Sequence, residues 1–333
     1  TPETITNFKD FVNYNYDETR NKYTIDPGEH WFFRERPDRP LLPPQFRFNW
    51  SSPFIISSHD SQKVLFGSNH LFQSYDRGDS WKIISPDLTT NDKELRNTSD
   101  GGGLTNSNTG GENHFTIITI SDTPLDTNLI WIGTDDGNIQ ITRDNGINWE
   151  NVRKNIKGVP SKTWVSRVEA SKHKEGRAYV TFDNHRFDDN KPYVFMTDDY
   201  GKSWTNISAN LPLDYSVYVI KEDYIDENLL FVGTEKSVYF TINRGKNWDK
   251  LGTKLPSVAI HDLVIHPRDG DLIAGTHGRS IWILDDISPL RKLDKKSNNL
   301  TPIRIATKWI KINTGRKQPF FEIRGENPPN GSI

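Results

Sequence analysis

Short apolar runs separated by polar turns recur along the middle of the chain. Each unit begins with a run such as Phe54–Ile56, followed by a second run, usually with a Gly-Ser or Gly-Thr step. The runs are short and bounded by turn-forming residues, which predicts β-strands. First runs begin near Phe54, Phe115, Val165, Val217 and Ile260, and the second runs occupy residues 64–68, 130–134, 178–181, 231–234 and 272–276. This pattern predicts five repeated units, each with four strands.

In four of these five units, the third predicted strand leads into the same eight-residue motif, or octet. Its pattern is Ser/Thr-x-Asp/Asn-x-Gly-x-Ser/Asn-Trp, at residues 74–81, 142–149, 197–204 and 241–248, and we call these segments the Trp turns. An acidic or amide side chain accepts hydrogen bonds from nearby backbone N–H groups, and Gly supplies a positive φ, so each octet predicts a hairpin turn. The Trp then anchors the next strand. The structural residues expected are Asp76, Gly78, Trp81, Asp144, Gly146, Trp149, Asp199, Gly201, Trp204, Asn243, Gly245 and Trp248.

The Trp turns resemble the Asp-box, or bacterial neuraminidase repeat, found in sialidases, sortilin-type propellers and bacterial proteins labelled glycosyl hydrolases. Three copies fit closely, and the fourth has Asn243 in place of Asp. Phrases at residues 46–54, 164–170, 183–186, 261–267 and 275–279 are also similar to large bacterial sortilin-like repeat proteins. The resemblance implies an all-β fold, with β-propeller blades of four antiparallel strands and Asp-box turns, in part of a larger propeller protein. It implies no particular reaction, because the repeat occurs in enzymes and non-enzymes.

The resemblance divides the chain into three segments. Residues 46–290 are expected to form five propeller blades, the last without a Trp turn. Residues 1–45 are interpreted as the outer hairpin of a preceding blade plus a Pro-rich connector. Residues 291–333 are interpreted as an edge strand and a linker toward a missing C-terminal domain.

Composition narrows the possible partners and compartments. The formal net charge of the 333 residues is −2, so no basic field attracts nucleic acid. No run approaches the roughly 20 apolar residues of a membrane helix, so membrane insertion is not expected. Cysteine is absent, which excludes disulfides and thiolate chemistry. The resemblance implies an extracytoplasmic protein that is periplasmic, on the cell surface or secreted, with its export signal outside this chain.

The predicted strand order places two sets of loops on one face. In a four-stranded blade, the turns between second and third strands lie beside the connections between blades, while the Trp turns lie on the opposite face. A loop-lined funnel is therefore expected to bind protein, peptide or glycan, as a module or as a component of a larger assembly. Its predicted ligand-binding residues are His70, His114, Trp164, Arg167, His185, Arg186, His261, His277 and Arg279.

A glycan-active enzyme is the alternative. Glycoside hydrolysis needs two suitably separated carboxylates, for which the funnel offers Asp135, Asp136 and Glu235. A sialidase would also need three arginines, for which Arg167, Arg186 and Arg279 are the candidates, but the Phe/Tyr-Arg-Ile-Pro phrase of that family is missing. The histidines show no His-x-His or His-Glu-x-x-His spacing, so neither a metal nor a cofactor is expected. The sequence leaves catalysis open.

Overall fold

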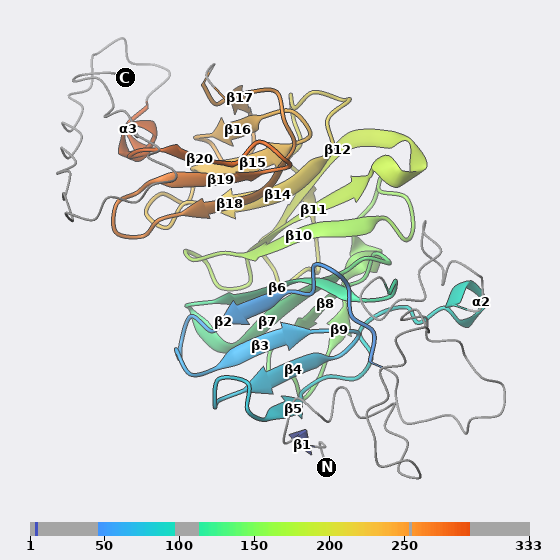
Figure 1. Cartoon of the computed structure of the whole chain (residues 1–333). Helices are drawn as coiled ribbons and strands as arrows, with labels where there is room; N and C mark the ends of the chain where they lie inside the picture. Colours follow the sequence, from blue (N-terminus) through green and yellow to red (C-terminus); the bar gives the residue numbers. More distant parts are fainter. Residues whose placement is uncertain (1–3, 6–45, 97–112, 253–254, 294–333) are drawn as a thin grey trace, which may run out of the picture.

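The computed structural model describes residues 4–5, 46–96, 113–252 and 255–293, which form antiparallel β-sheets in chain order (Figure 1). The first sheet contains β2 (Phe54–Ile56), β3 (Val64–Gly67), β4 (Leu71–Ser74) and β5 (Trp81–Ile83), with β1 (Thr4–Ile5) beside β5. The second contains β6 (Ile117–Thr123), β7 (Asp126–Thr134), β8 (Ile139–Thr142) and β9 (Glu150–Asn151). The third contains β10 (Trp164–Ala170), β11 (Ala178–Asn184), β12 (Asp189–Thr197) and β13 (Thr205–Asn206).

The remaining two sheets continue this order. The fourth contains β14 (Val217–Glu222), β15 (Leu230–Thr234), β16 (Val238–Thr241) and β17 (Asp249–Lys250). The fifth contains β18 (Ile260–Ile265), β19 (Leu272–Thr276) and β20 (Ile281–Leu284). Helical segments are short: α2 (Lys93–Arg96), η2 (Arg153–Asn155), η3 (His185–Phe187) and α3 (Ser288–Arg291). The predicted all-β class, built mostly of four-stranded antiparallel sheets, is confirmed.

Within the described residues the fifth sheet has three strands, and the edge strand predicted in residues 291–333 lies almost wholly outside them. Its described part ends at β20, after which the chain enters α3 with Pro289 in the first turn. No Trp turn follows β20, so nothing local reverses the chain into a fourth strand. The predicted segments 1–45 and 291–333 lie outside the described residues, except for β1 and residues 291–293.

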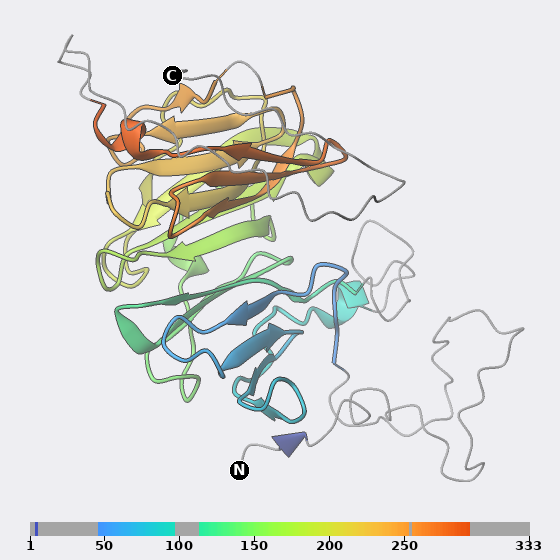
Figure 2. The ribbon, with the colours of Figure 1, turned by 60° about the vertical axis from the view of Figure 1, so that its left-hand side comes forward.

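The core lies between successive sheets, which Figure 2 shows stacked one after another. Side chains such as Trp131 and Phe182 are fully buried there. The second-strand glycines allow this close approach: a Cβ on Gly133 would lie 2.5 Å from Cγ1 of Val165, the first-strand residue of the next sheet. The Gly steps noticed in the sequence therefore mark where one sheet packs against the next.

The Trp turn at residues 197–204 shows why the octet has its composition. The backbone N–H of Ser203 donates to Asp199 Oδ1 at 2.9 Å, and the Ser203 hydroxyl donates to Asp199 Oδ2 at 2.6 Å. Gly201 has φ of 81°, and its N–H donates to Thr197 Oγ1 at 2.9 Å. Trp204 Nε1 donates to the Gly201 carbonyl at 3.1 Å. The octet is thus a self-contained turn.

The other Trp turns repeat the contacts of the Asp or Asn side chain and of the Gly N–H, with variations in the remaining contacts. In the first, hydrogen bonds from Ser80 lower the pKa of Asp76 to about 2. In the fourth, Asn243 Oδ1 accepts from the Asn247 N–H at 3.0 Å, as an Asp oxygen would. An amide has a single oxygen to offer, so Asn243 accepts from the Asn247 N–H and the Thr241 hydroxyl but has no second oxygen for the side chain of residue 247.

Replacing Asp199 with alanine is expected to lower the free energy of unfolding by about 1–2 kcal/mol, because the turn loses the acceptor for three hydrogen bonds. Urea unfolding followed by tryptophan fluorescence measures the change. Asp214→Ala is the matched control, since the Asp214 side chain is 74% exposed. Equal effects of the two substitutions would contradict a structural role for the turn carboxylate.

Candidate functional site

Side chains from the third, fourth and fifth sheets converge where first strands begin and second strands end. We call this set the rim cluster. Trp164 begins β10, and His185 and Arg186 lie on η3, the one-turn helix between β11 and β12. This helix ends at Asp188, which has φ of 57° and returns the chain into β12. The rim cluster consists of Trp164, Asp183, His185, Arg186, Tyr218, Glu235, His261 and His277.

Rings follow one another across the rim cluster. The Tyr218 and His261 rings stack with centroids 4.5 Å apart and an interplanar angle of 21°. His277 lies beside His261 at 5.2 Å, and His185 meets Tyr218 edge-on at 6.2 Å. At the other end, the Arg186 guanidinium lies 3.9 Å from the centre of the Trp164 ring. The row therefore joins three consecutive sheets.

Asp183 holds the η3 end of this row. Its side chain is 4% exposed, and its carboxylate contacts His185 Nδ1 at 2.7 Å and accepts from Arg186 Nη1 at 3.2 Å. Burying a carboxylate is costly unless it is paired, and these two groups supply the pairing. Asp183 therefore fixes the orientation of both neighbours.

Tyr218 and Glu235 form the second fixed pair. The Tyr218 hydroxyl donates to the Glu235 carboxylate. Burial, this hydrogen bond and the charge of Asp183 raise the pKa of Tyr218, so the phenol stays neutral. Burial and the neighbouring His277 lower the pKa of His261. The Tyr218 and His261 side chains at the centre of the row are therefore uncharged at neutral pH.

The two acidic residues proposed as catalysts on the second sheet are not open to a substrate. Asp135 and Asp136 are each 1% exposed. Asp135 accepts from the N–H and hydroxyl of Thr116 at 2.8 and 2.7 Å, and Asp136 accepts from the N–H and hydroxyl of Thr90 at 2.6 Å each. Burial and the charge of Asp135 raise the pKa of Asp136. Both carboxylates tie connecting segments to the sheet.

His114 belongs to this buried group. Its Nδ1 lies 3.4 Å from Asp135 Oδ2, and its ring lies 6.3 Å from that of Trp164. Burial opposes protonation, but the hydrogen bond and charge of Asp135, with the charge of Asp136, outweigh it and raise the pKa of His114. His114 thus connects the buried acids to the edge of the rim cluster.

Three predicted residues have other placements. His70 Nδ1 lies 3.1 Å from the Ser85 carbonyl on the first sheet. Arg167 Nη2 lies 2.7 Å from Asp262 and bridges β10 to β18. Arg279 is exposed in the turn after β19, where its backbone N–H donates to Thr276 Oγ1. Arg167 and Arg186, two of the three arginines considered for a sialidase clamp, thus pair with separate acidic residues.

Asp183 and Tyr218 were missed as site residues by the sequence reasoning. Tyr218 follows Val217, which begins the fourth sheet, so it occupies the kind of position that selected Trp164 and His261 on neighbouring sheets. Asp183 is the penultimate residue of a wholly buried strand, and only its place in the phrase at residues 183–186 distinguishes it.

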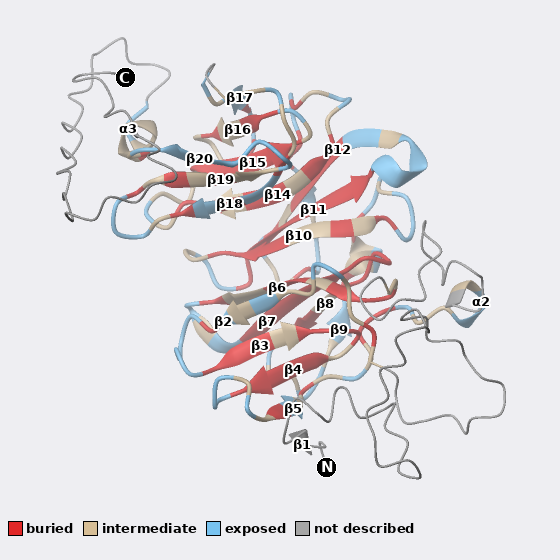
Figure 3. Ribbon diagram, in the orientation of Figure 1, coloured by how far each residue is buried: buried red, intermediate tan, exposed pale blue. Residues whose placement is uncertain are grey.

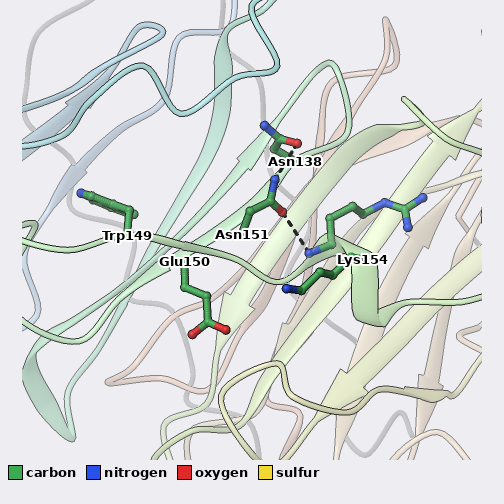
Figure 4. Close-up of a pocket in the computed structure, with 6 residues that line it drawn as sticks. Asn138, Trp149, Glu150, Asn151 and Lys154 are labelled. Carbon is green, nitrogen blue, oxygen red and sulfur yellow. Dashed lines mark hydrogen bonds between the residues drawn. The ribbon is translucent and has the colours of Figure 1, made fainter.

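A shallow pocket lies elsewhere, at the outer edge of the second sheet (Figure 4). Its volume is about 630 Å³, and Asn151 at its centre donates to Asn138 at 2.9 Å and accepts from the Arg153 N–H at 3.0 Å. Its lining residues are Asn138, Trp149, Glu150, Asn151, Arg153 and Lys154. The pocket shares no residue with the rim cluster.

The described residues contain neither a metal-binding group of side chains nor a helix that could span a membrane. No group of three or more His, Cys, Asp or Glu side chains in residues 46–96, 113–252 and 255–293 is arranged to hold a metal ion. Among the helices of the described part, none combines the length and apolar character needed to cross a membrane.

Comparison with known proteins finds a family that part of the chain resembles. Residues 192–297, about a third of the chain, match the Sortilin-Vps10 family model, described as sortilin, neurotensin receptor 3. The β-propeller is similar to sortilin over this segment. A comparison with curated proteins gave no match.

Solved structures share the fold of this sortilin-like chain. A GH74 xyloglucanase from Xanthomonas campestris is 17% identical, with a TM-score of 0.52 over 71% of this chain and 36% of that one. An ancestral GH74 enzyme is 16% identical, with a TM-score of 0.51 over 71% of this chain and 28% of that one. The sortilin-like chain thus spans about a third of the length of these proteins. At such identities the likeness establishes the propeller fold and no activity.

Proposed function

We propose that this sortilin-like propeller is an extracytoplasmic binding module that holds a peptide segment of a protein partner on the rim cluster. The observation that carries the proposal is the continuous row from Trp164 and Arg186 to His277, built by three sheets. Rigid sheets that present side chains at their loop ends are a common way to build a binding face.

The chemistry of the row suits a peptide. Arg186 uses one N–H group on Asp183, and a guanidinium has five such donors, so it retains donors for carbonyl or carboxylate oxygens of a ligand. The stacked Tyr218 and His261 rings offer aromatic surface beside it. Aromatic rings and arginine are the residue types that dominate protein-recognition sites.

Hydrolysis of a glycan is not favoured by this geometry. It needs two carboxylates facing one sugar ring. Asp135 and Asp136 are buried and hydrogen-bonded, Asp183 is 4% exposed, and Glu235 accepts from Tyr218. Among the described residues of the predicted funnel, the candidate carboxylates are thus committed to structural partners.

A displayed library of random peptides, selected against the full chain, tests the proposal. Selected peptides are expected to bind the wild-type protein, and Arg186→Ala is expected to weaken their binding at least about tenfold, a typical loss for a central interface arginine. Fluorescence anisotropy with synthetic peptides measures the dissociation constants.

Arg268→Ala is the matched control, because Arg268 is 80% exposed and lies between β18 and β19, away from the rim cluster. It should bind the selected peptides as the wild type does. Failure to select any peptide, or peptides that bind the Arg186→Ala variant equally well, would count against the rim cluster as a peptide site.

A further inference from the structure

Three sheets carry a carboxylate at one equivalent position, which we call the strand-end position. It directly follows a second-strand residue that pairs with the first strand beside a bulge: Thr134 with Ile117, Phe182 with Val165, and Thr234 with Val217. The second strands β7, β11 and β15 are buried as they reach this end of the sheet (Figure 3). The carboxylates at the strand-end position are those of Asp135, Asp183 and Glu235.

Two of these carboxylates are buried and paired within the protein. The Asp135 side chain is 0% exposed and accepts from the N–H and hydroxyl of Thr116. The Asp183 side chain is 4% exposed and is paired with His185 and Arg186. In the second and third sheets the strand-end carboxylate therefore has a structural role.

Glu235 is held in a different way. It is partly exposed, and it accepts from the Tyr218 hydroxyl, which uses one of the roughly four acceptor positions of a carboxylate. Lys236, the next residue, lies over the Tyr215 ring, with its Nζ 4.4 Å from the ring centre. Within the described part of the chain, no Lys, Arg or His side chain forms an ion pair with Glu235. Its charge is thus fixed in position but not paired.

The fourth sheet loses a hydrogen bond through this arrangement. In the second sheet, the Asp135 N–H donates to the Thr116 carbonyl, and the Thr116 hydroxyl donates back to the Asp135 carboxylate. In the fourth sheet, the Glu235 N–H donates to the Ser216 carbonyl, so Ser216 is the equivalent of Thr116. The Ser216 hydroxyl is buried, and among the described residues it has no hydrogen-bond partner. Because an unpaired buried hydroxyl is destabilising, the direction of Glu235 toward the rim cluster has a structural cost of the kind expected at a functional site.

We propose that Glu235 binds a cationic nitrogen group of the peptide held on the rim cluster, either a lysine or arginine side chain or a free amino terminus. This inference rests on the proposed peptide-binding function and names a property that the ligand must have. An ammonium or guanidinium group donates charge-assisted hydrogen bonds to a carboxylate, which are stronger than those between neutral groups. The Tyr218 and His261 side chains are uncharged at neutral pH, so they leave the charge of Glu235 for the ligand.

The rim cluster then offers two kinds of polar group to one ligand. Arg186 on the third sheet supplies hydrogen-bond donors, and Glu235 on the fourth sheet supplies acceptors. A single carboxylate of this kind suits a cation, whereas glycoside hydrolysis needs two. The ligand is therefore expected to carry its basic group at a fixed distance from the oxygen atoms that Arg186 binds.

Parallel selections from a displayed library of random peptides test this inference, on the full-length wild type and on Glu235→Gln. Glutamine keeps an oxygen that can accept from the Tyr218 hydroxyl, but it removes the charge. Peptides selected by the wild type are expected to share a basic residue or to need a free amino terminus, and those selected by the variant are not. Asp214→Asn is the matched control, because it removes one carboxylate charge from a side chain that is 74% exposed and outside the rim cluster. It should select the same peptides as the wild type.

Synthetic peptides measure the effect by fluorescence anisotropy. Replacing the shared basic residue with norleucine, or acetylating the amino terminus where that carries the charge, should weaken binding to the wild type about tenfold. The same change should leave binding to Glu235→Gln nearly unaltered. Wild-type peptides that share no cationic group, or equal losses for the two proteins, would overturn this inference and leave peptide binding standing. Selection of no peptide by either protein would overturn the proposed function, and this inference with it.

Discussion

Replacing Trp248 with alanine is expected to lower the free energy of unfolding by about 3–5 kcal/mol, because it leaves a cavity the size of an indole between two sheets. Trp248 ends the fourth Trp turn, is 2% exposed and packs with Leu211, Val217 and Leu230. Its Nε1 donates to the Ile207 carbonyl at 2.7 Å, so the substitution also leaves that carbonyl without its donor. Urea unfolding followed by circular dichroism measures the loss.

Trp50→Ala is the control for this prediction. The Trp50 side chain is 77% exposed, and surface substitutions usually change stability by less than about 0.5 kcal/mol. Similar losses for the two variants would show that the Trp of the turn is not an anchor between sheets.

The Trp turns were predictable because their chemistry is local. Every contact that defines the turn at residues 197–204 joins positions within that octet. Strand positions were predictable for a related reason, since runs of alternating or continuous apolar residues reflect burial within one sheet. Predicted first strands near Val165, Val217 and Ile260 begin within one residue of β10, β14 and β18.

The state of the funnel residues was not predictable, because it depends on remote partners. Asp136 is buried because Thr90, 46 residues earlier, donates two hydrogen bonds to it. Tyr218 belongs to the site because its hydroxyl reaches Glu235 and its ring stacks on His261. Nothing adjacent to these residues in the sequence specifies such contacts. Residue type and turn position therefore predicted which residues are candidates for the site, but they did not predict how exposed those residues are.

The side of the sheets away from the rim cluster is tied by polar contacts that repeat in alternate sheets. Ser57 donates to Asp122 at 2.9 Å, which joins the first sheet to the second. Ser171 donates to Glu222 at 2.9 Å, which joins the third sheet to the fourth. Two residues after each serine comes a histidine: His59 Nε2 lies 2.6 Å from the Thr123 carbonyl, and His173 Nε2 lies 2.7 Å from the Asp223 carbonyl. Neighbouring sheets are thus held together by the apolar packing between them and by these polar contacts on the side away from the rim cluster.

Glu169 is a buried charge in this polar layer. It lies on β10 with its side chain 7% exposed, and it accepts from Lys172 and Lys221, each at 2.9 Å. Burial disfavours its ionised form, but the charges of Lys221 and Lys172 outweigh burial and lower the pKa of Glu169 to about 2. Because Lys221 belongs to β14, this carboxylate couples the third sheet to the fourth.

Replacing Glu169 with glutamine is expected to lower the free energy of unfolding near neutral pH by about 2–3 kcal/mol, because two partly buried lysines lose their counter-charge. The pKa in the folded protein lies below the ordinary value of 4.5, so this stabilisation is present above about pH 4.5 and is lost as the pH falls toward about 2. Urea unfolding at about pH 7 and about pH 3 should therefore show the wild type and the variant converging in acid. Glu150→Gln is the control, since that carboxylate is 49% exposed and its pairing with Arg143 is at the surface. A difference between wild type and Glu169→Gln that stays constant with pH would show that the carboxylate stabilises the two sheets by its shape and not by its charge.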